Sequence, residues 1–170
     1  WLVETAHASA QVLVGGVGTS TAAAATATEL ALDGYDLVLA AGIAGGFTPV
    51  RNGAVVLADR VVAADLGYEN GADDGRAEFV PLDVMGFGSV THEPDAALVT
   101  RAAAALRDAC DEVVVGTVLT VSTVTGSPAS SARLSGRLPG AVAEAMEGFG
   151  VVTAALPHGV PVLELRTVSN

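Results

Sequence analysis

Residues 36–47, which read DLVLAAGIAGGF, decide the fold of this chain. Residues 36–41 are apolar after the first aspartate and predict a buried strand, and the glycine-rich residues 42–46 predict the turn that ends it. A second short apolar run lies at residues 10–15, and the alanine-rich segment from Thr19 to about Leu32 between the two runs predicts a helix. A strand, a helix and a strand within roughly thirty residues form a βαβ unit, so we expect these two strands to be parallel.

The same kinds of pattern predict further elements along the chain. Apolar runs predict strands at residues 54–65, 113–124, 141–145 and 161–168, and helical patterns cover residues 94–109, 128–137 and 147–156. Residues 66–94 are rich in Gly, Asp and Pro without sustained periodicity, so they predict a functional loop or partner-contacting insertion, with one short strand around Phe79. We therefore expect a three-layer α/β/α fold with a mixed, mostly parallel central sheet.

The length of the chain fits one domain. We expect residues 1–170 to form a single α/β domain that is truncated at both ends, because the sequence begins at Trp1 rather than Met and stops directly after a strand-like run. Half of the residues are hydrophobic but only 4% are aromatic, so the core must be built from Ala, Val and Leu.

Composition excludes several classes of function. The formal net charge is −11, with eight Arg and no Lys, so we expect no binding of nucleic acid, no Schiff-base chemistry and no P-loop. No apolar run approaches the ~18 residues of a membrane span. The single Cys110 excludes an internal disulfide framework and fits a reducing compartment, so we expect a cytoplasmic protein. The three histidines are scattered without ligand spacing, so we expect no metal and no cofactor.

Unusual residues follow several of the predicted strands. They are Ile43 to Phe47, Thr120 to Ser127, Met146 with Glu147, and Ser169 with Asn170. In α/β folds ligands bind at the carboxyl ends of strands, so we expect these residues to converge on one site. The glycines between Gly15 and Gly18 allow two interpretations: a tight turn into a helix, or a cradle of backbone N–H groups for phosphate.

Glu147 and Asn170 also allow two interpretations each. Glu147 opens a predicted helix, where the helix dipole alone favours a carboxylate, but it can also accept hydrogen bonds from the two vicinal hydroxyls of a ribose. Asn170 after a strand is commonly a turn residue, but its amide NH₂ suits the N7 and O6 acceptors of a 6-oxopurine.

Taken together, four segments resemble motifs of the purine nucleoside phosphorylase/nucleosidase superfamily. GIAGG at residues 42–46 resembles its G-S-A-G-G turn, and ADRVVAAD at 58–65 resembles its strand following G-D-I-V-V. EAMEG at 144–148 resembles E-M-E, and residues 159–170, ending in RTVSN, resemble V-P-F…R-x-I-S-D. Within the superfamily, TVSTVTG at 120–126, AMEGFG at 145–150 and the final Ser-Asn resemble the futalosine hydrolases.

The resemblance implies a phosphorylase/hydrolase-like fold and cleavage of the N-glycosidic bond of a purine nucleoside. The implied reaction is hydrolysis of futalosine to hypoxanthine and dehypoxanthine futalosine in menaquinone biosynthesis, by a homo-oligomer that is a dimer or larger. The implied catalytic residues are Glu147, which holds the ribose, and Asn170, which faces the departing base. The implied substrate-binding residues are Ile43, Ala44, Gly45, Phe47, Val124, Thr125, Met146 and Glu147, and Phe47 with the loop around Phe87 is implied to cover the pocket or contact a neighbouring subunit.

Two departures from the family pattern keep other functions open. The family's opening strand and its water-orienting glutamate precede Trp1, and Asn170 stands where related adenine nucleosidases have Asp. An amide can polarise a base but cannot act as a general acid, which favours a 6-oxopurine substrate. The alternatives are a methylthioadenosine/S-adenosylhomocysteine nucleosidase, a phosphorylase, and a nucleoside-binding module that is inactive in this truncated form. A Rossmann-type NAD protein is disfavoured, because no acidic residue follows the second strand in the expected setting.

Overall fold

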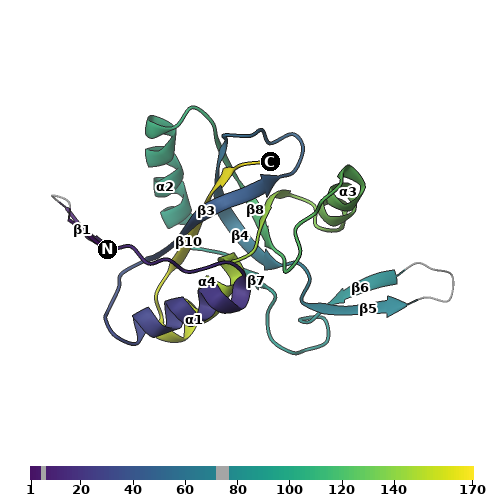
Figure 1. The fold of residues 1–170 in the computed structure, drawn as a ribbon, viewed down its shortest axis with the longest axis horizontal. Helices are drawn as coiled ribbons and strands as arrows, with labels where there is room; N and C mark the ends of the chain where they lie inside the picture. Colours follow the sequence, from purple (N-terminus) through teal and green to yellow (C-terminus); the bar gives the residue numbers. More distant parts are fainter. Residues whose placement is uncertain (5–6, 72–76) are drawn as a thin grey trace.

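The computed structural model describes residues 1–4, 7–71 and 77–170 of the chain (Figure 1). Its strands are β1 (Leu2–Glu4), β2 (Ser9–Gln11), β3 (Val38–Gly46), β4 (Val55–Ala63), β5 (Gly67–Gly71), β6 (Ala77–Pro81), β7 (Thr91–His92), β8 (Val113–Thr120), β9 (Ala141–Ala145) and β10 (Val162–Val168). Its helices are α1 (Thr19–Leu30), α2 (Ala96–Ala109), α3 (Pro128–Arg137) and α4 (Gly148–Ala155), followed by the 3-10 turn η1 (Leu156–His158).

The central sheet is mixed, as the sequence predicted. Six strands lie in the order β10-β3-β9-β8-β4-β7, and β10 also pairs with β4, so the sheet curls until five of its strands form a ring. Parallel pairing joins β10 to β3, β4 to β8 and β8 to β9, whereas β3 meets β9 in antiparallel fashion. The pairing of β3 with β9 places Gly45 opposite Glu144, so the end of one strand reaches the middle of another.

Helices cover both faces of this sheet because alternate side chains of each strand point to opposite faces. Val56 of β4 packs with α1 and α4, whereas the next residue, Leu57, packs with Val99 and Ala103 of α2. Figure 1 shows α1 and α4 together on one side and α2 on the other. Helices α1 and α4 approach closely, because a Cβ on Gly150 would stand 2.1 Å from the backbone oxygen of Thr19. The expected three-layer α/β/α arrangement is therefore confirmed.

The predicted βαβ unit at the start of the chain is wrong. Among the described residues, strand β2 pairs with β1 alone, in antiparallel fashion, and it is not a strand of the central sheet. The side chains of Val12, Leu13 and Val14 are 46%, 46% and 71% exposed. An apolar run predicts burial only if a neighbouring element covers it, and within the described residues no strand of the central sheet pairs with this run.

The predicted glycine turn at residues 42–46 is also wrong. These residues continue strand β3, paired with β10 as far as Ala44 and with β9 at Gly45 and Gly46. Glycine is required here for close packing rather than for a turn. A Cβ on Gly42 would stand 2.5 Å from the Arg166 guanidinium, and one on Gly46 would stand 2.7 Å from Val168.

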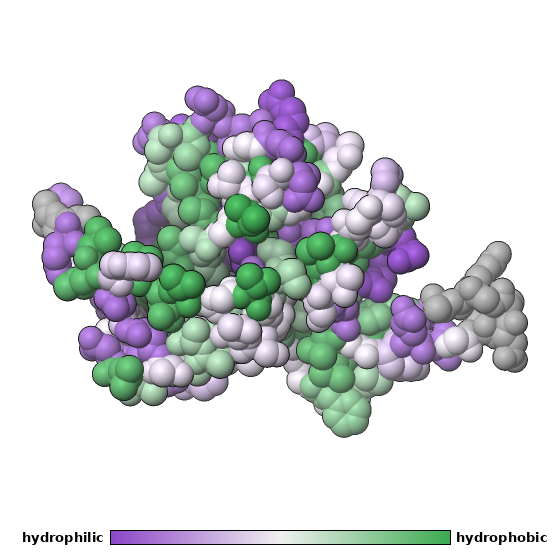
Figure 2. Space-filling model, in the orientation of Figure 1, coloured by the Kyte–Doolittle hydropathy of each residue, from purple (hydrophilic) through white to green (hydrophobic). Residues whose placement is uncertain are grey.

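The segment from Leu66 to Pro94 has more structure than the sequence predicted. Strands β5 and β6 pair as a hairpin, and β7 adds two residues to the edge of the central sheet beside β4. Residues 72–76 of this predicted loop lie outside the described residues. Apolar side chains are exposed between β6 and β7, notably Val84 (73%) and Phe87 (71%), in a region that is green in Figure 2. No helix in the described ranges is both long and apolar enough to cross a membrane.

Candidate functional site

A cavity of about 350 Å³ lies where the end of β3 meets β9. Its wall combines glycines, hydroxyls, one acid and one amide, from segments far apart in the sequence. They are Gly45, Gly46, Thr125, Gly126, Ser127, Pro128, Ser131, Glu144 and Asn170.

Asn170 is fixed in this cavity by its own backbone and by Ser169. The Gly46 N–H donates to the Asn170 carbonyl at 2.8 Å, and the Ser169 N–H donates to the Ala44 carbonyl at 2.9 Å. The Ser169 hydroxyl lies 3.0 Å from Oδ1 of Asn170 and donates to it. A Cβ on Gly45 would stand 3.4 Å from Nδ2 of Asn170, so the NH₂ group lies toward the space beside Gly45, where it can donate to a ligand.

Glu144 stands beside this amide and is only 3% exposed. Its Oε1 accepts two hydrogen bonds from Thr125, one from the backbone N–H at 2.8 Å and one from the hydroxyl at 2.6 Å. A Cβ on Gly45 would stand 3.3 Å from Cγ of Glu144 and 3.4 Å from Nδ2 of Asn170. The absence of a side chain at Gly45 therefore leaves the acid and the amide open to the same space.

Thr125 is held in place by the start of α3. Ser127 and Ser130 form a capping box, in which each serine hydroxyl receives a hydrogen bond from the backbone N–H of the other residue. Pro128 occupies the first turn, where a missing N–H costs nothing. The sequence therefore fixes the point at which the loop after β8 turns into the helix, and with it the position of Thr125.

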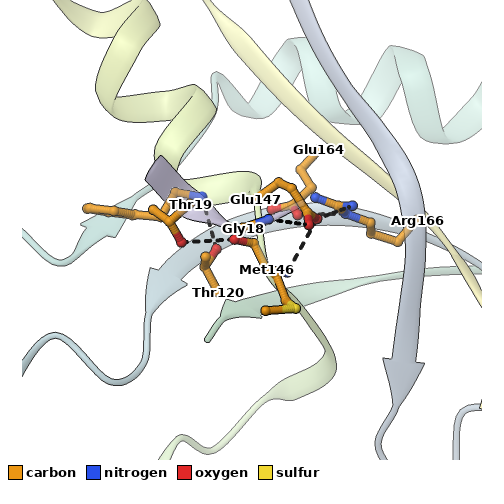
Figure 3. A network of polar contacts seen from close by, with 8 residues as sticks. Gly18, Thr19, Thr120, Met146, Glu147, Glu164 and Arg166 are labelled. Atoms are coloured by element: carbon orange, nitrogen blue, oxygen red, sulfur yellow. Dashed lines mark hydrogen bonds and ion pairs between the residues drawn. The ribbon is translucent and has the colours of Figure 1, made fainter. Parts of the chain in front are cut away.

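Glu147 lies in a second polar network (Figure 3). Its Oε1 accepts from the Gly18 N–H at 3.1 Å, and its Oε2 accepts from the Arg166 guanidinium at 3.0 Å and from the Met146 N–H at 3.3 Å. The Gly18 N–H therefore donates to this carboxylate, which does not favour the interpretation of the glycines before α1 as a phosphate cradle. With about four acceptor positions on a carboxylate, Oε1 keeps capacity for a further donor.

Arg166 is itself held by a fully buried acid. Its Nε donates to Oε1 of Glu164 at 2.8 Å, and the two side chains are 4% and 0% exposed. Burial raises the pKa of Glu164 above its ordinary value, and the neighbouring Arg166 charge opposes that rise. Gly148 makes room for this acid, since a Cβ there would stand 2.1 Å from Oε2 of Glu164. The buried pair thus holds the guanidinium against Glu147.

A second cavity of about 290 Å³ lies at the start of α1. Met146 and Ser122 line it together with the residues at the start of the helix, which are Val17, Gly18, Thr19, Ser20 and Thr21. The Thr19 hydroxyl donates to the Met146 carbonyl at 2.8 Å, which ties the helix to the end of β9. Glu147 lines neither cavity, but it accepts hydrogen bonds from two residues of this wall, Gly18 and Met146.

The structure brings together some of the residues that the sequence singled out and separates others. Gly45, Thr125 and Asn170 line the first cavity, and Met146 lines the second. The side chain of Ile43 is 70% exposed and that of Val124 is 52% exposed, and neither residue lines a cavity wall. Ala44 and Phe47 are buried, at 4% and 3% exposure, in apolar clusters of the core. Glu147 and Asn170 do not share a wall of either cavity.

Glu144 is the residue that sequence reasoning missed. The signal was present, because a glutamate at the fourth position of the strand AVAEA places an acid among small apolar residues. Acids are rarely buried without a partner, so this pattern predicts a hydrogen-bonded carboxylate beside a site. No group of three or more His, Cys, Asp or Glu that could hold a metal ion occurs among the residues that the structure describes.

The chain is similar in sequence to known proteins over most of its length. The chain is 57% identical over 165 residues to the futalosine hydrolase of Streptomyces coelicolor, a match that covers 94% of this chain and 66% of that protein. It is 47% identical to the futalosine hydrolase of Acidothermus cellulolyticus, over 96% of this chain and 65% of that protein. The chain therefore spans just under two thirds of the length of these relatives.

The fold is also found in solved structures. The structure of futalosine hydrolase from Helicobacter pylori matches with a TM-score of 0.75 and 20% sequence identity, over 92% of this chain and 66% of that chain. The sequence profile of the phosphorylase superfamily matches residues 6–170, which is nearly the whole chain. By this match and by the fold it shares with those enzymes, the chain belongs to the phosphorylase superfamily.

Proposed function

We propose that this chain binds a purine nucleoside and hydrolyses its N-glycosidic bond, with futalosine as the substrate. Water and futalosine would give hypoxanthine and dehypoxanthine futalosine. The observation that carries the proposal is the amide of Asn170, which lines the first cavity and whose Oδ1 accepts a hydrogen bond from Ser169. The 57% and 47% identities to futalosine hydrolases support the choice of substrate.

Bond cleavage in this proposal is dissociative, so positive charge develops on the ribosyl carbon and negative charge on the departing base. Asn170 donates to N7 or O6 of the 6-oxopurine and stabilises that negative charge. Glu147 holds a ribose hydroxyl through the remaining capacity of Oε1, while Arg166 and Met146 keep the carboxylate in place. Met146, which lines the neighbouring cavity, packs its thioether against the sugar.

Water is preferred to phosphate as the attacking group in this proposal. A phosphate site favours an arginine or lysine that can bind its oxygens. The described walls of the two cavities contain no arginine, and the sequence contains no lysine. The choice of hydrolysis over phosphorolysis rests on the similarity to futalosine hydrolases, and the lack of a cation in these two walls agrees with it.

The biological setting belongs to the same proposal. Removal of hypoxanthine from futalosine is a step of menaquinone biosynthesis, which we place in the cytoplasm, where a single free thiol such as Cys110 stays reduced. We propose that the protein is a homo-oligomer with a small nucleoside as its ligand. A net charge of −11 argues against nucleic acid as a partner.

The test is to incubate the protein with futalosine, inosine and methylthioadenosine, with and without phosphate, and to separate the released bases by chromatography. We expect hypoxanthine from futalosine at a rate that does not depend on phosphate. Asn170→Ala should lower kcat by about a hundredfold or more, because it removes a donor to the departing base. Asn70→Ala, an exposed asparagine of β5, is the matched control and should keep the wild-type rate.

Each of the other functions has its own result in this assay. Release of adenine from methylthioadenosine while futalosine stays intact would identify a methylthioadenosine nucleosidase. Strict dependence on phosphate would identify a phosphorylase. Binding of futalosine without turnover would identify a binding module.

A further inference from the structure

The loop between β8 and α3, residues 122–126, borders both cavities. It contributes Ser122 to the wall of the second cavity, and Thr125 with Gly126 to the wall of the first. Residues 122–124 are exposed, so little packing holds this part of the chain in place. The position of the loop therefore depends on the hydrogen bonds that its backbone makes to neighbouring elements.

Two carboxylates from different parts of the sheet accept hydrogen bonds from this loop. Oε1 of Glu144, in β9, accepts from the backbone N–H and the hydroxyl of Thr125. Oδ2 of Asp65, which lies between the end of β4 and the β5–β6 hairpin, accepts from the backbone N–H of Ser122 at 2.5 Å. Each end of the loop is thus tied to an acid, and the acid at the Ser122 end lies outside both cavity walls.

The residue before Asp65 holds the far end of α3. The last residue of this helix is Arg137, and its guanidinium donates to the Ala64 carbonyl. The same guanidinium lies over the ring of Phe79 in β6, 4.1 Å from the ring centroid, and Figure 1 shows α3 and the β5–β6 hairpin on the same side of the molecule. Ala64 and Asp65 therefore hold both ends of residues 122–137, which comprise the loop and the helix.

Asp65 acts on this segment through a hydrogen bond and through its charge. Burial lowers the pKa of Arg137, and the negative charges of Asp65 and Glu69 oppose this lowering. Glu69, an exposed residue of β5, shares the effect on Arg137, whereas the hydrogen bond to Ser122 belongs to Asp65. The two effects can therefore be separated by substitution.

We propose that Asp65 is a positioning residue for the hydrolysis, and that it acts by holding the loop at residues 122–126 through the Ser122 N–H. This inference rests on the proposed function and adds to it a residue that touches no substrate. In the proposed reaction the base lies in the first cavity and the sugar lies against Met146 of the second, so the bond that breaks lies between the two cavities that the loop borders. A displaced loop would misplace the sugar relative to the base, and a misplacement of about 1 Å at a reacting site can cost about a hundredfold in rate.

Two substitutions of Asp65 test whether the hydrogen bond or the charge matters. Asp65→Ala removes the acceptor, whereas the amide oxygen in Asp65→Asn can still accept from the Ser122 N–H although the charge is lost. Glu69→Gln is the control, because it removes the other negative charge that acts on Arg137. For each protein we would measure kcat and KM with futalosine, and the hydrogen exchange of the backbone amides by mass spectrometry.

We expect Asp65→Ala to lower kcat by about tenfold and to change KM by less than about threefold, because a displaced loop affects the geometry of the reacting bond more than the binding of substrate. Amide exchange should become faster at Thr123 to Gly126 as well as at Ser122. Exchange in β8 should stay at the wild-type rate, which separates a displaced loop from a loss of the fold. Asp65→Asn and Glu69→Gln should behave like the wild type in both measurements.

Two results would overturn the role of Asp65 in the reaction. One is a wild-type kcat for Asp65→Ala, and the other is a kcat for Asp65→Asn as low as that of Asp65→Ala, because charge rather than the hydrogen bond would then be responsible. Unchanged amide exchange at residues 123–126 in Asp65→Ala would overturn the anchoring of the loop whether or not the protein is active. A wild type that cleaves no nucleoside would instead overturn the proposed function.

Discussion

Gly45 controls how much space the acid and the amide of the first cavity share. Its Cα stands opposite Glu144 in the antiparallel pairing of β3 with β9, and a Cβ on Gly45 would also meet Nδ2 of Asn170. A methyl group at this position would contact both side chains at 3.3–3.4 Å, tighter than nearly all such contacts.

Gly45→Ala should therefore lower kcat/KM for futalosine by about tenfold to a hundredfold, because a misplacement of about 1 Å at a reacting site can cost about a hundredfold. Steady-state hydrolysis checks this, with circular dichroism to confirm the fold. Gly126→Ala is the matched control, since it lies in the same wall but a Cβ there meets nothing within 4 Å. Equal rates for Gly45→Ala and the wild type would show that the base does not bind in this cavity.

Single residues also show the limits of sequence reasoning. Asn170, Thr125 and Gly45 could be singled out because strand ends and family motifs point to them, and the structure places all three in one wall. Phe47 could not be placed, because an aromatic residue after a glycine run fits a pocket cover as well as a core position. It is buried beside Val62 and Leu119, where the sheet meets α3. Whether a residue contacts ligand depends on such packing, which no local pattern contains.

At the scale of elements, β10 supplies both members of a buried ion pair. Glu164 and Arg166 are two residues apart, so their side chains leave the same face of the strand. The guanidinium connects the buried carboxylate of Glu164 to Glu147, at the boundary between β9 and α4. The strand thereby positions a residue of the proposed sugar site from within the core.

Glu164→Gln should change how stability depends on pH. The raised pKa means that the folded protein holds the Glu164 proton more tightly than the unfolded chain, so the stability this group contributes is full below its unfolded pKa of about 4.5. The stability that Glu164 contributes is lost as the pH rises through its pKa in the folded protein. The Glu164→Gln variant shows no such loss, because glutamine does not titrate. The free energy of unfolding of the wild type should therefore fall relative to that of Glu164→Gln as the pH rises above about 4.5.

Urea denaturation of both proteins at several pH values between about 4.5 and 8 measures this difference. Glu112→Gln, which removes an exposed partner of Arg51, should show no comparable change. A difference between wild type and Glu164→Gln that stays constant, or that shifts in favour of the wild type with rising pH, would contradict the account.

The bounds of a helix or strand were predictable where residues close in sequence mark its first or last position. The bounds of α3 and β9 follow from the sequence, because Ser127 and Pro128 begin the helix and Gly140 precedes the strand. The sequence predicts a turn at the glycine run of β3, because a local pattern cannot show that Arg166 and Val168 will pack against it. Whether the backbone at these glycines forms a turn or a strand depends on contacts with residues more than a hundred positions away in the sequence.

At the scale of the whole molecule, the class of the fold was predictable and its closure was not. Apolar runs with helices between them predict a layered α/β domain, which the structure confirms. The pairing of β10 with both β3 and β4 joins segments that are far apart in the chain, and it turns the sheet into a ring. Residues 12–14 form an apolar run but are exposed. The sequence of such a run does not show which other part of the protein, if any, covers it.

The exposed side chains between β6 and β7 give a prediction about assembly. Val84 and Phe87 are 73% and 71% exposed, in a region that is green in Figure 2, and a patch of exposed apolar side chains is typical of a surface that contacts another protein. We expect the protein to sediment as a dimer or larger and the Val84→Ser/Phe87→Ser double variant to sediment as a monomer in analytical ultracentrifugation. Leu32→Ser, equally exposed at the end of α1, is the control and should leave the assembly unchanged. A monomeric wild type would refute the proposed assembly.

The central claim is that the cavity between Gly45, Glu144 and Asn170 binds the purine base. A crystal structure of the protein with hypoxanthine tests it most directly. The account predicts the base in this cavity, with O6 or N7 within hydrogen-bond distance of Nδ2 of Asn170. Hypoxanthine bound instead in the cavity at the start of α1, without contact to Asn170, would contradict it.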